Sequence, residues 1–214
     1  MRSVVLVGAS GLAREVMMVV RDRYDDVVVV DDDSQLWGTR IHGALVIGPP
    51  SVAAEPGTGD IVVCVGSGAA RRAIVERLGA LGVGADRYPV VLEESVRVPS
   101  TCTIGPGSVL LAGVVLTCDV HLHRHVVVMP HVTLTHDDVV QDYATLCAGV
   151  ALGGGVTVGA AAYLGMNASV RQDVTIGPGA VLGMGAVLVR DLPAGETWTG
   201  VPAAHHAIPR QLVR

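Results

Sequence analysis

A repeat with a period of six residues occupies almost half of the chain and limits the possible folds more than any other feature. An aliphatic residue stands at every sixth position from Val98 to Leu188, without a gap. A second series, two residues earlier in each repeat, runs from Val96 to Ala186 and contains small or β-branched residues except at Asp138. A period of six matches neither a helix nor a single strand, whereas it is the repeat of a parallel β-helix.

Each repeat is expected to form one face of a three-sided turn, with the aliphatic residue pointing to the axis. Turns stack about 4.8 Å apart, so that five turns give a column roughly 24 Å long. Glycine often follows the aliphatic residue, and we expect the chain to turn a corner with positive φ there. These glycines are Gly105, Gly153, Gly159, Gly165, Gly177 and Gly183. The alternative is a β-sandwich, which would need turn signals at irregular intervals rather than a fixed period.

Composition agrees with such a column and argues against several classes of protein. Half of the residues are hydrophobic, only 3% are aromatic and Phe is absent, which suits a core of Val, Leu, Ala and Gly. The net charge of −5 argues against nucleic acid as the main partner. The four Cys lack CxxC spacing and are expected to be buried thiols rather than disulfides or ligands. Neither a signal peptide nor a membrane-length apolar run is present, so we expect a cytoplasmic protein with no membrane partner.

The residues before the repeat alternate between strand and helix patterns, which predicts a small parallel sheet. The expected strands are 3–8, 27–30, 60–65 and 88–92, with a short one near 44–47, and the expected helices are 14–23 and 69–81. About 90 residues suffice for half of a dinucleotide-binding fold. The predicted domains are a Rossmann-like half-domain at 1–93 and the β-helix with a C-terminal tail at 94–214.

Three loops at the carboxyl ends of the predicted strands outline a nucleotide site. Gly8 and Gly11 flank a turn into a helix, where backbone N–H groups can bind an anion. Asp31 stands 20 residues after Gly11, the spacing at which dinucleotide folds place a ribose-binding acid. The segment Gly66-Ser67-Gly68 is placed to close over the same ligand. The alternatives are tight strand–helix packing and a solvated acidic loop, since the G-x-G-x-x-G pattern is not met.

Most histidines of the repeat are expected to be solvated or interfacial. They are His121, His123, His125, His131 and His136. The pair His131 and His136, five residues apart, resembles the zinc pair of the β-helical carbonic anhydrases. The third ligand of that family falls on Ser95 or Ser100 here, so we expect no metal site.

His136 has acidic neighbours that set it apart from the other histidines. Asp137 adjoins it, and Asp138 puts a carboxylate where the repeat otherwise has a small residue. A buried acid needs a partner, and a nearby histidine is oriented by such an acid and has its pKa raised. We therefore expect His136 to be the partner of this carboxylate and a candidate base. An exposed polar corner is the alternative.

Several short motifs together resemble the bacterial hexapeptide-repeat acetyltransferases that act on sialic acid and on nucleotide-linked 4-amino sugars. They are Gly-Ala-Ser-Gly-x-Ala at 8–13, Asp-Asp at 31–32, Gly66, His-Asp at 136–137, the Gly153–Gly155 corner and Gly-Val-Pro-Ala at 200–203. The resemblance covers nearly the whole chain in order. It implies a left-handed β-helix, a homotrimer, and acetyl-CoA bound in the groove between neighbouring columns.

By this resemblance, His136 is the general base that removes a proton from a sugar amine, and Asp137 raises its basicity. The amide N–H of Gly154 would meet the thioester carbonyl. The other residues implied are Thr145, Met166 and Met184 for acetyl-CoA, and Ser10, Gly11, Leu12, Asp31, Asp32 and Gly66 for the sugar nucleotide. The expected activity is N-acetylation of a nucleotide-linked amino sugar of the 4-amino-4,6-dideoxy type.

The chain departs from the family pattern at four positions around the expected acceptor and acetyl group. Members often have His at the positions of Leu12 and Thr145, Asn at Met129 and Cys at Asp138. These departures leave three alternatives to N-acetylation. They are O-acetylation of a sialic-acid-like sugar, a metal-dependent lyase of the carbonic anhydrase type, and a non-catalytic trimeric scaffold that binds sugar nucleotides.

Overall fold

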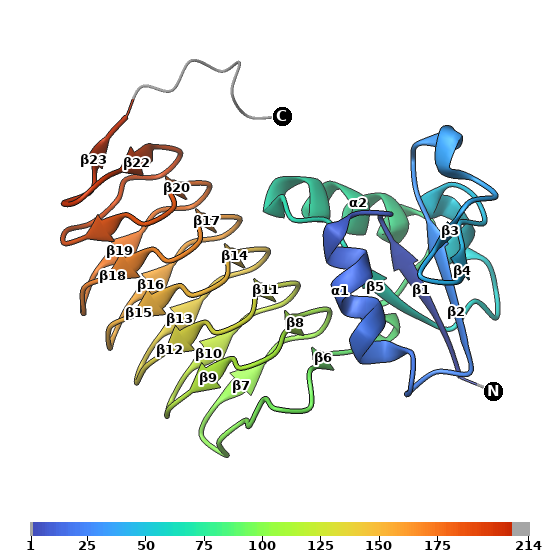
Figure 1. Cartoon of the computed structure of the whole chain (residues 1–214), viewed down its shortest axis with the longest axis horizontal. Helices are drawn as coiled ribbons and strands as arrows, with labels where there is room; N and C mark the ends of the chain where they lie inside the picture. Colours follow the sequence, from blue (N-terminus) through green and yellow to red (C-terminus); the bar gives the residue numbers. More distant parts are fainter. Residues whose placement is uncertain (1, 207–214) are drawn as a thin grey trace.

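The computed structural model describes residues 2–206, so residues 207–214 of the predicted tail lie outside the described part. The chain forms an α/β unit followed by a three-sided β-solenoid (Figure 1). This order confirms the predicted architecture of a half-domain with a parallel sheet and a hexapeptide-repeat column. Within residues 2–206, no helix combines the length and apolar character needed to cross a membrane.

The α/β unit is a small parallel sheet with one long helix on each face. Strands β1 (Ser3–Val7), β2 (Asp26–Val30) and β5 (Asp60–Val63) pair in the order β2-β1-β5. Alternate residues of β1 point to opposite faces, so Val4 and Leu6 pack against α1 (Gly11–Val20) and Val5 and Val7 against α2 (Gly68–Ala80). The shorter elements are η1 (Ser34–Leu36), β3 (Arg40–Ile41), β4 (Ala44–Leu45), η2 (Pro50–Ala54) and η3 (Ala85–Arg87).

The solenoid has three sheets of short parallel strands, one on each face. The first contains β7 (Thr103–Ile104), β10 (His121–Leu122), β13 (Val139–Val140), β16 (Thr157–Val158) and β19 (Thr175–Ile176). The second contains β9 (Val115–Leu116), β12 (Thr133–Leu134), β15 (Ala151–Leu152), β18 (Ser169–Val170) and β21 (Val187–Leu188). The third contains β6 (Val91–Leu92), β8 (Val109–Leu110), β11 (Val127–Val128), β14 (Thr145–Leu146), β17 (Tyr163–Leu164), β20 (Val181–Leu182), β22 (Thr197–Thr199) and the antiparallel β23 (Ala204–His205).

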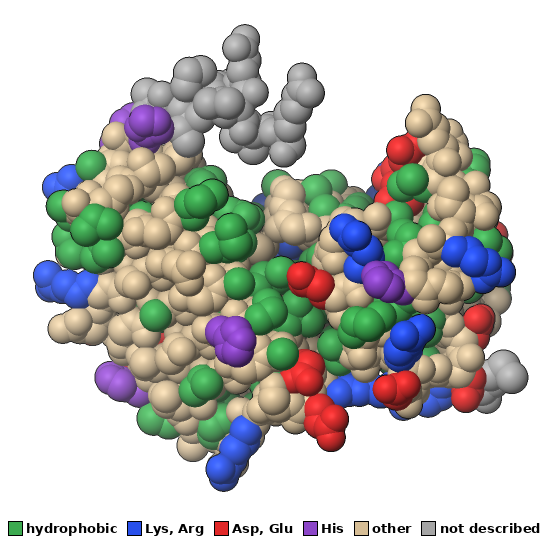
Figure 2. Space-filling model, in the orientation of Figure 1, with side chains coloured by type: hydrophobic (Ala, Val, Ile, Leu, Met, Phe, Trp, Pro, Cys, Tyr) green, Lys and Arg blue, Asp and Glu red, His purple; other side chains and the backbone are tan. Residues whose placement is uncertain are grey.

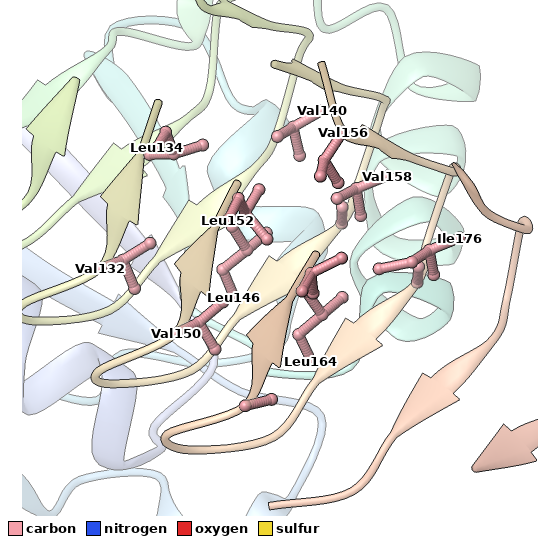
Figure 3. Close-up of a cluster of buried hydrophobic side chains, with 14 of the residues drawn as sticks. Val132, Leu134, Val140, Leu146, Val150, Leu152, Val156, Val158, Leu164 and Ile176 are labelled. Atoms are coloured by element: carbon pink, nitrogen blue, oxygen red, sulfur yellow. The ribbon is translucent and has the colours of Figure 1, made fainter. Parts of the chain in front are cut away.

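The six-residue period produces this column because three repeats complete one turn. Strands in adjacent turns pair 18 residues apart, as Val127 does with Thr145. The predicted five turns become about six, since β6 and β22 add rungs to the third face. From Leu110 onward the aliphatic series is buried, and its side chains meet along the axis (Figure 3). Each buried Val or Leu contributes about 1.5–3 kcal/mol, so the repeat itself supplies the core.

The expected positive φ at the glycines after the aliphatic residues was wrong. The left-handed residue of a corner comes two positions later, as at Gly107 and Gly155, and several non-glycine residues also adopt it. The glycines next to the aliphatic residues are instead required by close contact between turns. A Cβ on Gly159 would lie 2.5 Å from the backbone nitrogen of Pro178 in the next turn.

Helix α1 joins the two parts of the molecule, because it packs between the sheet and the first turns of the solenoid (Figure 1). Its Val16 and Met17 share one buried cluster with Val109 and Val127 of the column. The chain enters the column through β6, which pairs with β8. The lower turns therefore form a fixed platform for the α/β unit.

A second connection is made by Arg71 of α2, whose side chain is only 1% exposed. Its guanidinium donates hydrogen bonds of 2.7–3.1 Å to oxygens of both parts. The acceptors are the carbonyls of Val65, Gly66, His125, Tyr143 and Ala144 and the hydroxyl of Thr145. Burial lowers the pKa of Arg71 to about 10, so the group stays charged at neutral pH. One cation thus links the loop after β5 to two turns of the solenoid.

The imidazole of His125 lies next to this cation without repelling it. It stacks on Tyr143, with ring centroids 5.1 Å apart, and meets the edge of Tyr88 at 4.8 Å. Burial, assisted by the charge of Arg71, lowers the pKa of His125 to about 4. His125 is therefore neutral at physiological pH, and its ring packs within the junction between the two parts.

Candidate active site

His136 lies on the corner that follows β12, and its side chain is 63% exposed. Its Nδ1 is 2.8 Å from Oδ2 of Asp137, which has a left-handed φ of 63°. The carboxylate can only accept, so Nδ1 carries the hydrogen in the neutral ring and the lone pair of Nε2 is available. The hydrogen bond to Asp137 raises the pKa of His136, and the charges of Asp137, Asp138 and Asp173 act in the same direction. The predicted His-Asp pair is therefore formed on the surface.

Gly154 lies directly against this imidazole, one turn farther along the column. A Cβ on Gly154 would lie 2.3 Å from both Cε1 and Nε2 of His136. A side chain at this position would displace the ring from its observed place. The structure therefore brings together the predicted base and the residue predicted to stabilise an oxyanion.

Replacing Gly154 by Ala is expected to lower kcat by about 10²-fold, because the new methyl group displaces the imidazole and misplaced catalytic groups lose activity on this scale. Steady-state kinetics measures the effect. The backbone itself tolerates alanine here, because the matching corner positions of other repeats hold Ala148 and Ala160. Gly79→Ala in α2, where a Cβ meets no neighbour, is the control with unchanged activity. Wild-type kcat in Gly154→Ala would contradict the steric argument.

Asp138 is fully buried, but its partners differ from the histidine that we expected. Its Oδ2 accepts the N–H of Thr135 at 2.8 Å, and its Oδ1 accepts the N–H of Val156 at 2.9 Å. Burial raises the pKa of Asp138 to about 6 despite these two hydrogen bonds. The hydrogen-bond partner of His136 is Asp137 alone among the described carboxylates.

Met166 and Met184 lie on a different edge of the column from His136. They follow β17 and β20 of the third face, on consecutive turns, and are 50% and 73% exposed. Hydrophobic side chains gather on the upper solenoid and along its border with the α/β unit (Figure 2). The two methionines thus form an apolar stripe suited to a long, partly apolar ligand.

Thr145 is buried in the junction between the two parts rather than exposed on an edge. Its hydroxyl donates to the carbonyl of Gly66 at 2.8 Å and accepts from Arg71 at 3.0 Å. Both hydrogen-bonding functions of the hydroxyl are therefore occupied within the chain. Thr145 therefore supports the loop after β5.

A cavity of about 500 Å³ opens beside the N-terminus of α1. It is lined by Ala9, Ser10, Gly11, Arg14, Leu36, Thr39, Arg40, Ile41 and His42. Ser10 caps the helix, because its hydroxyl accepts the N–H of Leu12 at 3.1 Å and donates to the carbonyl of Cys64 at 2.7 Å. Two arginines, a histidine and the positive end of a helix make this cavity suitable for an anion.

Of the residues predicted for the sugar nucleotide, Ser10 and Gly11 line this cavity. Asp31 lies behind the glycine turn and accepts the N–H of Ala9 at 2.6 Å. The others occupy different places. Leu12 is buried in the core, Asp32 pairs with Arg77 at 2.8 Å, and the carbonyl of Gly66 accepts from Arg71 and Thr145.

The basic side chains of the cavity were missed by the sequence analysis. Arg14 follows Gly11 by one helical turn, a spacing that places both on the same side of α1. Arg40 and His42 fall in the segment that was expected to be mainly loop, and they alternate along the chain. These two spacings are the sequence features from which the basic lining of the cavity could have been predicted. Among residues 2–206, no group of three or more His, Cys, Asp or Glu is arranged to hold a metal ion.

Each of the two parts of the chain matches a known family model. Residues 3–78 match the family model described as the PglD N-terminal domain, and residues 155–190 match the bacterial transferase hexapeptide model of six repeats. A comparison with curated protein sequences returned no match.

Solved structures match over almost the full length. The acetyltransferase domain of PglB from Neisseria gonorrhoeae FA1090, in complex with acetyl coenzyme A, is 32% identical, with a TM-score of 0.87 over 96% of this chain and 99% of that one. A mutant of perosamine N-acetyltransferase from Caulobacter crescentus, in complex with CoA and GDP-perosamine, is 28% identical, with a TM-score of 0.88 over 97% and 98%. The chain therefore belongs to the hexapeptide-repeat sugar acetyltransferases, with a left-handed β-helix and acetyl-CoA as the acetyl donor.

Proposed function

We propose that the protein transfers the acetyl group of acetyl-CoA to the amine of a nucleotide-linked amino sugar of the 4-amino-4,6-dideoxy type. The observation that carries this proposal is the exposed His136–Asp137 pair packed against Gly154. The likeness to a perosamine N-acetyltransferase that holds CoA and GDP-perosamine supports the substrate class.

The chemistry needs one base and one oxyanion donor, because a thioester is already activated. The sugar amine attacks the thioester carbonyl carbon while Nε2 of His136 takes a proton from the nitrogen. The N–H of Gly154 stabilises the oxyanion of the tetrahedral intermediate. The C–S bond then breaks, and the proton on His136 passes to the departing CoA thiolate. Asp137 holds the ring in the required tautomer throughout.

The assembly that fits this site is a homotrimer with acetyl-CoA between columns. His136 and Gly154 lie on the edge after the second face, whereas Met166 and Met184 lie on the edge after the third. Two edges of one triangular column are separated by a face, so a single ligand reaches both sets only where a neighbouring copy supplies one of them. Thr145 is given a supporting role in this proposal, since its hydroxyl is occupied by Gly66 and Arg71.

The cavity beside α1 is the proposed site of the nucleotide. Ser10 and Gly11 present the helix N-terminus to the diphosphate, while Asp31 holds the glycine turn from behind. In this proposal Asp32 and Gly66 contact the ligand only at the rim, and Leu12 shapes the turn from the core.

Arg14→Ala is expected to raise the KM for the sugar nucleotide by about tenfold or more, because a charge-assisted hydrogen bond to phosphate contributes about 1.5–3 kcal/mol. The value of kcat should stay the same, since Arg14 lies on the nucleotide cavity and not on the corner of His136. Initial rates at varied sugar nucleotide give both constants. Arg97→Ala, which removes an exposed arginine before the first turn, is the charge-matched control. An unchanged KM would place the phosphates elsewhere.

The direct test of function combines acetyl-CoA with UDP-, dTDP- and GDP-linked 4-amino sugars and identifies products by mass. N-acetylation gives an acetyl group that resists mild base, whereas O-acetylation gives a base-labile one. Turnover of a sialic-acid-like sugar, with none of any amino sugar, would replace N-acetylation by O-acetylation. Binding of sugar nucleotides without acetyl transfer would favour the scaffold.

A further inference from the structure

Asp138 breaks the hexapeptide pattern at the level of the proposed base. Its place in the second inward series is held elsewhere by small or aliphatic residues, such as Ala144 one repeat later. The side chain of Asp138 is 0% exposed. A carboxylate in such a place is stable only when its oxygens are well bonded, so the question is what its bonds hold together.

One bond alters the corner before His136. In other turns the residue after the aliphatic position donates its N–H to the next turn, as Thr117 does to the carbonyl of Leu134. Thr135 occupies the equivalent place but directs its N–H to Oδ2 of Asp138 at 2.8 Å. Its hydroxyl takes over the contact with the next turn and donates to the carbonyl of Leu152 at 3.0 Å. The corner of the base is therefore shaped by Asp138.

The other bond alters the corner that contains Gly154. At several other corners the inward N–H bonds to the carbonyl three residues earlier, as Ala162 does to Gly159 at 3.1 Å. Val156 instead donates to Oδ1 of Asp138 in the preceding turn, at 2.9 Å. Leu134, Leu152 and Val156 all point into the same packed core, which fixes the backbone on both sides (Figure 3).

We propose that Asp138 is a positioning residue for acetyl transfer: its carboxylate bridges the corner of His136 and the corner of Gly154, and so fixes the base relative to the oxyanion donor. This inference rests on the proposed roles of His136 and Gly154. The two oxygens of the Asp138 carboxylate connect two consecutive turns. One of these turns carries His136 and the other carries Gly154, and both residues act on the same tetrahedral centre in the proposed reaction. Asp138 itself contacts neither substrate nor reacting atom.

Asp138→Ala is the sharpest test, because alanine is the normal residue of this series and a buried charge is removed with it. The variant should still fold, because the N–H groups of Thr135 and Val156 can turn to the carbonyl acceptors that the equivalent groups use at other corners, as Thr117 and Ala162 do. Its kcat should fall by about 10²-fold, because His136 and the N–H of Gly154 are no longer held in the correct relative position. The KM values for acetyl-CoA and for sugar nucleotide should stay the same. Asp138→Asn, which keeps the shape and one acceptor oxygen, should recover part of the lost kcat.

The control is Ser108→Ala. Ser108 makes the same kind of bond on another edge of the column, where it precedes β8 and accepts the N–H of Val126 at 3.0 Å. Its removal should leave kcat unchanged. A second readout is the double variant His136→Ala/Asp138→Ala, which should be no slower than His136→Ala because no base remains to be positioned.

Three outcomes distinguish a wrong positioning role for Asp138 from a wrong assignment of His136 as the base. Wild-type kcat in Asp138→Ala, beside a strongly impaired His136→Ala, would overturn the positioning role and leave the proposed function intact. A loss in the double variant equal to the product of the single losses would show that Asp138 acts independently of His136, which also overturns it. Full activity in His136→Ala would instead reject the proposed base itself.

Discussion

Replacing His136 by Ala is expected to lower kcat by about 10²–10⁴-fold, the usual contribution of a general base. The imidazole is exposed on the solenoid edge, oriented by Asp137 and pressed against Gly154, so its removal deletes the group that takes the amine proton. The KM for acetyl-CoA should change little, because the proposed coenzyme stripe lies on another edge. Steady-state rates followed by thiol release give both constants.

The matched control is His121→Ala. This histidine is also exposed on the solenoid, where its Nδ1 lies 2.9 Å from the hydroxyl of Thr103. Its removal should leave kcat unchanged. An equal loss in both variants would show that the effect of His136 is not specific to the proposed site.

The same assignment fixes the pH dependence. Free enzyme must hold the neutral imidazole, so kcat/KM should rise with pH through the pKa of His136, which the hydrogen bond to Asp137 raises from its ordinary value. Asp137→Asn keeps a hydrogen-bond acceptor but removes the charge. The inflection should therefore move to lower pH, and a move to higher pH would contradict the electrostatic role of Asp137.

Arg71→Met is expected to lower the free energy of unfolding by at least about 3 kcal/mol, because hydrogen bonds to a charged group contribute about 1.5–3 kcal/mol each and are not fully additive. Methionine fills the apolar volume but leaves the carbonyls of the junction without their donor. Since these carbonyls include Gly66, the loop after β5 should loosen as well. Denaturant unfolding followed by circular dichroism measures the change.

Arg72→Met provides the matched control for this prediction. Arg72 is the next residue of α2 and is half-buried, and its guanidinium lies 5.3 Å from the ring centroid of Tyr143. Its replacement should change the free energy of unfolding by less than about 1 kcal/mol. Equal stability of the two variants would mean that the buried cation is not the main link between the α/β unit and the column.

The column could be predicted from the sequence because a single physical requirement repeats. Almost every inward position meets copies of itself above and below and is apolar, with Ser108 and Asp138 as buried polar exceptions, and the period is visible in residues such as Leu134 and Leu152. The glycine argument failed because glycine satisfies two different needs. At Gly107 it permits a left-handed φ, whereas at Gly159 it avoids the backbone of the next turn.

The junction could not be predicted because its partners carry no sequence signature. Arg71 bonds to backbone carbonyls up to 73 residues away, and any residue type supplies a carbonyl. Thr145 was expected to bind acetyl-CoA because of its place in a family motif. In the structure its hydroxyl instead donates a hydrogen bond to the carbonyl of Gly66 inside the junction. The His-Asp pair was accessible to sequence reasoning because both members are adjacent and their chemistry depends on their side chains.

Because its turns are equal, the column sets the height of each corner residue in steps of one turn. The α/β unit is anchored on the lowest turns through Val109 and Val127, and the histidine stands at a fixed number of turns above that anchor. Insertion of one 18-residue block between these levels would raise the reactive nitrogen by about 4.8 Å, but it would also carry Tyr143 and Thr145 away from Arg71 and Gly66. The height of the histidine on the column and the contacts of the α/β unit are therefore set together, and a change in the length of the column requires a matching change at the junction.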